Sequence, residues 1–142
     1  MQKLIALLAV ALLPMLSFGQ DCEQILKNCE KYFKNAKGNS QFTSDGQVYA
    51  AFLDRQTAEY NVTLYGGGTY RIVANAGSND NYALFTVKDL NGNIIFRNSD
   101  HKNAPYWDFK VPQTIPVVIE TGLDADKKFT GCVVMLIGFK KK

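Results

Sequence analysis

The sequence predicts a mainly β protein: an antiparallel β-sandwich of jelly-roll type with about eight strands and one N-terminal amphipathic helix packed on it. Three observations lead to this class. Apolar and polar residues alternate along most of the chain from residue 47 onward. Clusters rich in Gly, Asn and Asp separate the alternating segments. A helical pattern occurs once, ahead of all of them.

The N-terminus has the three parts of a cleavable signal peptide. Lys3 supplies the positive charge, residues 4–13 form an uninterrupted apolar run, and small residues precede a cleavage site after Gly19. The apolar run is shorter than the roughly 20 residues that a membrane-spanning helix requires. We therefore expect residues 1–19 to be removed near Gly19/Gln20, leaving a periplasmic or secreted protein without a membrane span.

The charge pattern excludes a nucleic-acid partner. The chain has 16 basic and 13 acidic residues. Cleavage removes Lys3, and residues 140–142 are all lysines at the C-terminus, so the rest of the mature chain has a formal charge of −1. Nucleic-acid binding requires basic residues clustered on a surface. Such a cluster occurs here only at the terminus.

Three cysteines in an oxidising compartment predict one disulfide and one leftover thiol. Cys22 and Cys29 are about 10 Å apart along a helix, which is too far for a bond between them. We favour a bond between Cys29 and Cys132, because Cys29 lies in the middle of the apolar face of the helix. A bond between Cys22 and Cys132 is the first alternative, and three reduced buried thiols are the second.

Residues 20–38 are predicted to be the N-terminal helical region, in which the helix runs from Asp21 to about Ala36. Gly38 provides a stop signal. Apolar residues recur along one face at helical spacing: Ile25, Leu26, Cys29, Tyr32 and Phe33. Because the opposite face mixes Glu with Lys, we expect the helix to pack on the β domain rather than on a membrane.

Residues 39–142 are predicted to form the β-sandwich domain. The pair Asn91-Gly92 stands between two alternating segments and is a strong hairpin signal. The expected strands are Gln47–Leu53, Ala58–Tyr65, Thr69–Asn75, Tyr82–Lys88, Asn93–Arg97, Tyr106–Val111, Pro116–Thr121 and Gly131–Phe139.

The second half of the chain resembles the bacterial pre-peptidase C-terminal domain, a small secreted β-sandwich. The resemblance rests on the strand Thr69–Val73, the turn Asp89–Asn93, the strand Pro116–Glu120 and the terminal strand Cys132–Phe139. The chain is also similar to the short, single-domain exported proteins of Bacteroidetes-type genomes. What these resemblances imply is a fold class, and a fold does not define a function.

Calcium does not follow from this resemblance. Calcium-binding members of the family have acidic residues at positions that correspond here to Tyr82 and Leu84. Asp124-Ala125-Asp126 begins like an EF-hand loop, but the required glycine and the final acidic residue are absent. We expect no metal or other cofactor. An irregular calcium site is the remaining alternative, built from Asp80, Asp89, Asp124 or Asp126.

The most aromatic segment supplies the candidate binding residues. Alternation places Trp107 and Phe109 on one face of a strand and Tyr106 with Asp108 on the other. The simplest interpretation assigns Trp107 and Phe109 to the core. The alternative is a sugar-stacking platform, whose candidate members are Tyr65, Tyr82, Tyr106, Trp107 and Asp108.

No pattern in the sequence predicts catalysis. His101 is the sole histidine, and it stands in a polar loop without a nucleophile motif nearby. We therefore expect a non-catalytic binding module whose ligand is a glycan or an envelope protein. The alternative is a structural, assembly or inhibitor-like partner protein of the cell envelope.

Overall fold

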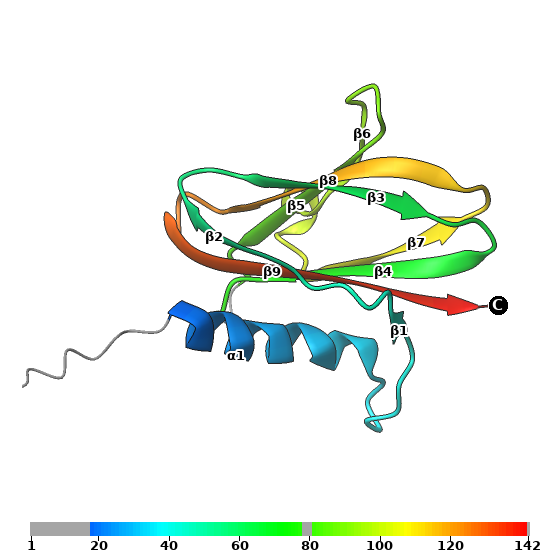
Figure 1. Cartoon of the computed structure of the whole chain (residues 1–142), viewed down its shortest axis with the longest axis horizontal. Helices are drawn as coiled ribbons and strands as arrows, with labels where there is room; N and C mark the ends of the chain where they lie inside the picture. Colours follow the sequence, from blue (N-terminus) through cyan, green and yellow to red (C-terminus); the bar gives the residue numbers. More distant parts are fainter. Residues whose placement is uncertain (1–17, 78–80, 142) are drawn as a thin grey trace, which may run out of the picture.

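The computed structural model describes residues 18–77 and 81–141. It consists of two antiparallel sheets packed face to face, with a helix on the outer face of one of them (Figure 1). This arrangement confirms the predicted sandwich and its N-terminal helix. The predicted signal peptide falls largely on residues 1–17, which lie outside the described residues.

The elements follow one another in the order α1, η1, β1–β6, η2 and β7–β9. The helical elements are α1 (Phe18–Glu30) and the 3₁₀ turns η1 (Lys31–Phe33) and η2 (Asn98–His101). The strands are β1 (Thr43–Ser44), β2 (Tyr49–Asp54), β3 (Ala58–Leu64), β4 (Gly68–Asn75), β5 (Ala83–Lys88), β6 (Ile94–Arg97), β7 (Tyr106–Val111), β8 (Ile115–Leu123) and β9 (Thr130–Lys141).

The eight predicted strands correspond to β2 through β9. β1 was not predicted, because two residues are too few to show an alternating pattern. In the larger sheet, β1 and β2 both pair with one side of β9, and β4 and β7 follow on the other side. The second sheet has the order β3-β8-β5-β6. Strands β2 and β3 therefore form one side of the sandwich, and β6 and β7 form the opposite side.

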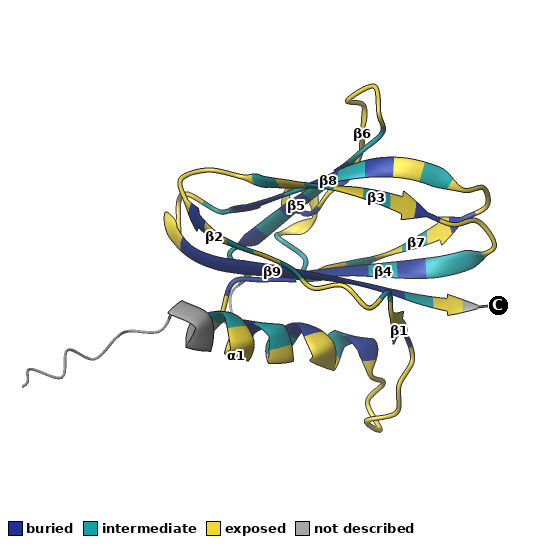
Figure 2. Cartoon of the chain, viewed as in Figure 1, coloured by how far each residue is buried: buried dark blue, intermediate teal, exposed yellow. Residues whose placement is uncertain are grey.

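Strand β9 is buried on both faces (Figure 2). Val133, Met135 and Ile137 point into the core between the two sheets. Cys132, Val134 and Leu136 belong to a second apolar cluster beneath the helix. The near-continuous apolar run of this strand follows from its place between the two layers.

Helix α1 packs its apolar face on the outer side of the larger sheet, where Ile25 and Cys29 are buried together with Phe33 of η1. Its end differs from the predicted end near Ala36: the helix ends at Glu30, and η1 follows it. The Phe33 carbonyl accepts hydrogen bonds from the returning amides of Gln41 and Phe42. Those bonds turn the chain back toward the sheet and prevent the helix from continuing.

The hairpin between β5 and β6 confirms the turn predicted at Asn91-Gly92. The Asp89 carboxylate accepts hydrogen bonds from the backbone amides of Asn91 and Asn93, and Gly92 has a positive φ of 82°. A further hydrogen bond from the Asn93 side chain is the main reason that the pKa of Asp89 is lowered. The sequence and the local hydrogen bonds thus agree on this turn.

Candidate functional site

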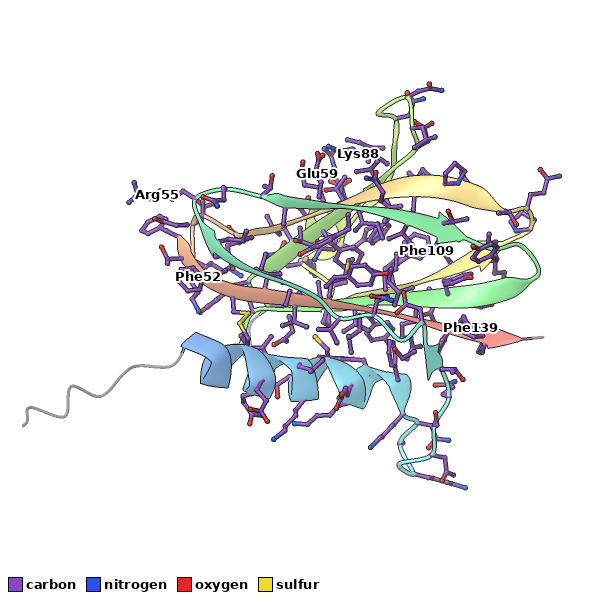
Figure 3. All side chains as sticks on the ribbon, in the orientation of Figure 1. Phe52, Arg55, Glu59, Lys88, Phe109 and Phe139 are labelled. Atoms are coloured by element: carbon purple, nitrogen blue, oxygen red, sulfur yellow. A yellow bond between two sulfur atoms is a disulfide. The ribbon has the colours of Figure 1, made fainter. Side chains whose placement is uncertain are left out.

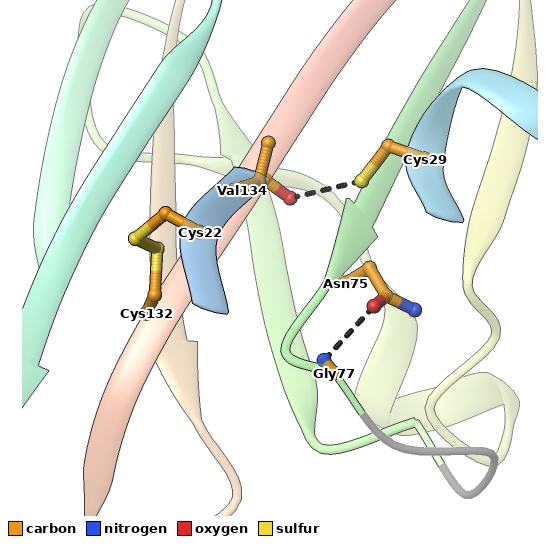
Figure 4. Close-up of a disulfide and its surroundings, with 6 residues drawn as sticks. All are labelled: Cys22, Cys29, Asn75, Gly77, Cys132 and Val134. Carbon is orange, nitrogen blue, oxygen red and sulfur yellow. Dashed lines mark hydrogen bonds between the residues drawn. A yellow bond between two sulfur atoms is a disulfide. The ribbon is translucent and has the colours of Figure 1, made fainter. Parts of the chain in front are cut away.

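The disulfide joins Cys22 to Cys132 across 110 residues (Figure 4). The favoured bond between Cys29 and Cys132 is therefore wrong, and the first alternative is the one formed. The reason is the position of the helix along β9. Cys22, near the start of the helix, meets Cys132, whereas Cys29, two turns later, donates its thiol to the carbonyl of Val134 at 3.5 Å. Burial raises the pKa of Cys29 to about 12, so this thiol is not a nucleophile at neutral pH.

The five candidate binding residues do not form one surface. Tyr65 follows β3 at the end of the sandwich where β8 begins, and Tyr82 precedes β5 at the end where β8 finishes. Tyr106 and Asp108 contact Arg71, on the face that carries the helix, whereas Trp107 points into the sandwich. One small ligand therefore could not contact all five side chains at once.

Tyr106 and Asp108 instead enclose Arg71. The Arg71 guanidinium lies 4.2 Å from the ring centres of both Phe42 and Tyr106. Its Nε and Nη2 donate to the two carboxylate oxygens of Asp108 at 2.7 and 2.9 Å, and its Nη1 donates to the carbonyl of Tyr32 at 2.7 Å. The hydrogen bonds to Asp108 raise the pKa of Arg71. We call these residues the Arg71 cluster; it ties the end of the helix to β4 and β7.

Trp107 is half-buried and closes part of the side formed by β6 and β7. Its ring packs 4.8 Å from the Phe96 ring and 4.3 Å from the His101 ring. His101 is exposed, yet it also stacks on Phe96 at 5.2 Å. Trp107 therefore packs against the core and also against the ring of the loop residue His101.

Two of the four residues considered for calcium binding, Asp89 and Asp124, accept hydrogen bonds from the chain itself. Asp80 lies outside the described residues, and Asp89 accepts hydrogen bonds within its own turn. Asp124 accepts from the Asn103 side chain at 2.9 Å and from the backbone amide of Asp126 at 3.1 Å. Across residues 18–77 and 81–141, no group of three or more His, Cys, Asp or Glu side chains is placed to hold a metal ion.

Another part of the surface has the character of a binding site. It lies at the end of the sandwich formed by the turn between β2 and β3 and the loop between β8 and β9, and Figure 3 shows Phe52 and Arg55 there. The Arg55 guanidinium lies 5.3 Å from the centre of the Phe129 ring, and the Arg55 amide donates to the Phe129 carbonyl at 3.0 Å. Phe52 and Phe129 are 48% and 57% exposed. We call Phe52, Arg55, Lys128 and Phe129 the Arg55 end.

The Arg55 end contains a shallow hollow. It has a volume of about 520 Å³, and its walls include Arg55, Leu123, Lys128 and Phe129. A pocket with an apolar floor and a few charged groups suits one side chain of a partner protein. This site was missed in the sequence because Arg55 and Phe129 stand far apart in the chain. The sequence contained one indication of the site: the turn Asp54–Thr57 lacks Gly and Asn, which tight turns favour.

No helix in the described part of the chain is long and apolar enough to cross a membrane.

Comparison with known proteins identifies a similar fold. No protein-family model matches the chain, and no curated protein matches it. Among solved structures, the chain resembles the crystal structure of Aeromonas hydrophila PliG, a periplasmic lysozyme inhibitor of g-type lysozyme. The TM-score is 0.51 at 17% sequence identity, over 75% of this chain and 92% of PliG. At this level of identity the likeness establishes the fold.

Proposed function

We propose that this protein is an extracytoplasmic, inhibitor-like binding protein whose partner is a lysozyme. The observation that carries the proposal is the structural likeness to PliG, which extends over 92% of that inhibitor. The likeness favours the alternative of an inhibitor-like partner protein over a glycan-binding module.

The surface chemistry supports a protein partner. Aromatic residues and arginine are enriched in protein–protein interfaces relative to the rest of the surface. Arg55 and the exposed ring of Phe129 provide this combination at one end of the molecule. The aromatic residues expected to bind a sugar do not gather into a platform, because Tyr106 is engaged with Arg71 and Tyr65 lies at the other end from Tyr82. Glycan binding stays a prediction.

The cysteines support a location outside the cytoplasm. A disulfide between Cys22 and Cys132 persists in oxidising compartments such as the periplasm. The predicted signal peptide points to the same compartments. An inhibitor of cell-wall hydrolysis would meet its enzyme there.

A lysis assay tests the proposal. The full chain is expressed with its own N-terminus, and the exported product is purified and added to a g-type lysozyme acting on a suspension of peptidoglycan. We expect the fall in turbidity to slow in proportion to the protein added, and the two proteins to co-elute in gel filtration. The same chain unfolded by reduction in urea and diluted into the assay is the control. Full lysis at a hundredfold molar excess, with no co-elution, would contradict the proposal.

A further inference from the structure

Basic residues gather at the end of the sandwich where β3 passes into β4 and where the C-terminus lies (Figure 1). Four segments meet there, residues 31–44, 64–71, 109–115 and 137–141. They contain six lysines and one arginine of the chain's 16 basic residues, and none of its 13 acidic residues. Lys142 follows them in the sequence. This end is therefore strongly basic, whereas the rest of the chain has more acidic than basic residues.

Strand pairing places two of these lysines in one row. Thr69 of β4 lies directly opposite Lys110 of β7 on one side and Lys140 of β9 on the other. Residues directly opposite one another in antiparallel strands project from the same face, so the two lysines stand about 10 Å apart with Thr69 between them. The Lys140 ammonium lies 5.2 Å from the centre of the Phe42 ring. The row is therefore on the outer face of the larger sheet, beyond the end of the helix.

The loop between η1 and β1 brings two more lysines to this end. Lys34 pairs with Ser40 across the loop, and the Asn35 side chain accepts a hydrogen bond from the Lys37 amide at 3.0 Å. Both lysines are exposed. The loop is thus closed by its own bonds, and it presents Lys34 and Lys37 next to the last residues of β9.

We call this surface the lysine end, and its members are Lys34, Lys37, Lys110 and Lys140. None of the four forms an ion pair with a carboxylate in the described part of the chain. The two acidic residues that border it are engaged elsewhere, Asp108 with Arg71 and Asp45 with the Tyr49 hydroxyl at 2.8 Å. The fold thus extends the lysine cluster of the C-terminus into a surface whose charge awaits an anionic partner.

The lysine end also has an aromatic part. Tyr65 follows β3 directly and is 64% exposed. The turn Gly66–Gly68 has no side chains, and a hollow of about 520 Å³ opens there between Tyr65 and Phe139. Tyr70 and Lys140 complete its walls. Tyrosine beside lysine is the combination found where proteins meet the headgroup region of a membrane.

The walls of the hollow distinguish between two anionic partners. Recognition of a polysaccharide requires polar groups placed to bond its hydroxyls. None of the described residues that line the hollow is Asn, Gln, Asp or Glu. An anionic lipid surface requires only cations near the headgroups and an amphipathic ring between them. The composition of this surface therefore favours a lipid partner.

From these observations we infer that the lysine end docks on a membrane surface rich in anionic phospholipid. Its lysines lie at the level of the lipid phosphates, and Tyr65 inserts between the headgroups. Arg55 precedes β3 and Tyr65 follows it, so the Arg55 end points away from the membrane in this orientation. The inference does not depend on the proposed function, since it concerns the opposite end of the molecule.

Sedimentation with lipid vesicles tests the inference. The purified exported protein is mixed with vesicles of phosphatidylcholine alone, or of phosphatidylcholine with about 30% phosphatidylglycerol, and the bound fraction is measured after centrifugation. We expect binding to the anionic vesicles only. The binding should weaken as the salt concentration is raised, because ions screen exposed charges. Equal binding to both kinds of vesicle, or binding to neither, would overturn the inference.

The double variant Lys110→Gln, Lys140→Gln measures the contribution of the row. A lysine close to an anionic surface contributes about fivefold in affinity, so the partition coefficient should fall by about 30-fold. The matched control is Lys102→Gln, Lys127→Gln, which removes the same charge from two exposed positions outside the lysine end. Its partition coefficient should stay within about twofold of the wild-type value. Equal losses in the two double variants would show that binding follows net charge, and would overturn the inference.

A tryptophan at either end of the molecule reports the orientation. Brominated phosphatidylglycerol quenches tryptophan fluorescence on close approach, and the native Trp107 is common to both variants. Quenching should increase in Tyr65→Trp and not in Phe129→Trp, whose ring lies at the Arg55 end. Quenching confined to Phe129→Trp would overturn the inference.

An acidic polysaccharide provides the last comparison. The protein is added to alginate in place of vesicles, and binding is measured for the wild type and for the double variant at residues 110 and 140. We expect weak binding to alginate relative to the anionic vesicles. Binding to alginate that depends on these two lysines, without binding to vesicles, would overturn the inference in favour of a glycan.

Discussion

Arg71 and Arg55 each lie against aromatic rings, but their surroundings are opposite. Arg71 is enclosed between two rings and donates to Asp108 and to the Tyr32 carbonyl. Arg55 lies over one exposed ring and forms no ion pair with the described carboxylates. The first arrangement satisfies the guanidinium within the protein. The second leaves its hydrogen-bonding capacity for another molecule.

The same contrast holds for the regions around them. The face with the Arg71 cluster is covered by helix α1, which the disulfide and a buried apolar cluster hold in place. The Arg55 end combines the end of strand β2 with two loops and carries exposed rings. Substitutions on the helix-covered face should therefore change stability, and those at the Arg55 end should change binding. Substitutions in the two regions test this division, and their expected effects on stability decrease from the disulfide to Arg55.

Removal of the disulfide should have the largest effect. The bond closes a loop with a sequence separation of 110 residues. In the chain-entropy model a loop of this size contributes about 4–5 kcal/mol. The double variant Cys22→Ser, Cys132→Ser should lose about that much free energy of unfolding in urea titrations. A loss below about 1 kcal/mol would show that the helix stays on the sheet by packing alone.

Arg71→Ala should have the next largest effect. It removes two hydrogen bonds to Asp108 and one to the Tyr32 carbonyl, and it leaves Asp108 without its partner. Because the Asp108 side chain is 39% exposed, solvent compensates part of the loss. We expect a decrease of about 2 kcal/mol in the free energy of unfolding. Arg71→Lys should recover part of it, and an unchanged urea midpoint for Arg71→Ala would contradict a structural role.

The buried thiol of Cys29 should make the helix-covered face sensitive to alkali. Burial raises its pKa from 9.0 to about 12, so the unfolded chain releases this proton at a lower pH than the folded one. The resulting stabilisation is complete below pH 9 and declines as the pH rises toward 12.

The comparison with Cys29→Ala isolates this contribution. Tyr49 acts in the same direction, because burial and a hydrogen bond to Asp45 raise its pKa to about 12. Its contribution is present in both proteins and cancels in the difference. Between pH 8.5 and pH 10.5, below the raised pKa of about 12, the urea midpoint of the wild-type protein should therefore fall more steeply than that of Cys29→Ala. Parallel pH profiles would contradict the prediction.

Arg55→Ala should have the smallest effect on stability. The substitution removes a single contact to an exposed ring, and alanine retains the backbone strain. We expect the free energy of unfolding to change by no more than about 0.5 kcal/mol. A loss comparable to that of Arg71→Ala would mean that Arg55 also has a structural role, and the contrast between the two clusters would fail.

The regular parts of the fold were predictable because their signals are local. Alternation located β2 through β9, and the pair Asn91-Gly92 located the hairpin. The end of the helix was placed too late, because the bonds that turn the chain back come from residues 41 and 42. The disulfide was assigned to the wrong helix cysteine for a similar reason. The periodicity of a helix shows which face is apolar but not where that face sits along its partner strand.

The candidate site depended on tertiary structure to a greater degree. The sequence indicated Tyr106 and Asp108 as binding residues because they stand in an aromatic strand, and the fold engages them with an arginine from a neighbouring strand. Arg55 and Phe129 are separated by most of the domain, and they meet because β2 and β3 diverge into different sheets beside the start of β9. No short-range sequence pattern indicates this contact between Arg55 and Phe129.

By itself the sequence determined that the chain forms a two-layer β protein with a covering helix, since the period of apolar residues follows directly from the geometry of strands and helices. It also predicted, without excluding three reduced thiols, a disulfide between the helix and the last strand. The tertiary structure decided which cysteine forms that bond, which aromatic residues are used internally and which arginine remains open. These outcomes depend on distances between residues far apart in the chain, and those distances exist only once the sheets have packed.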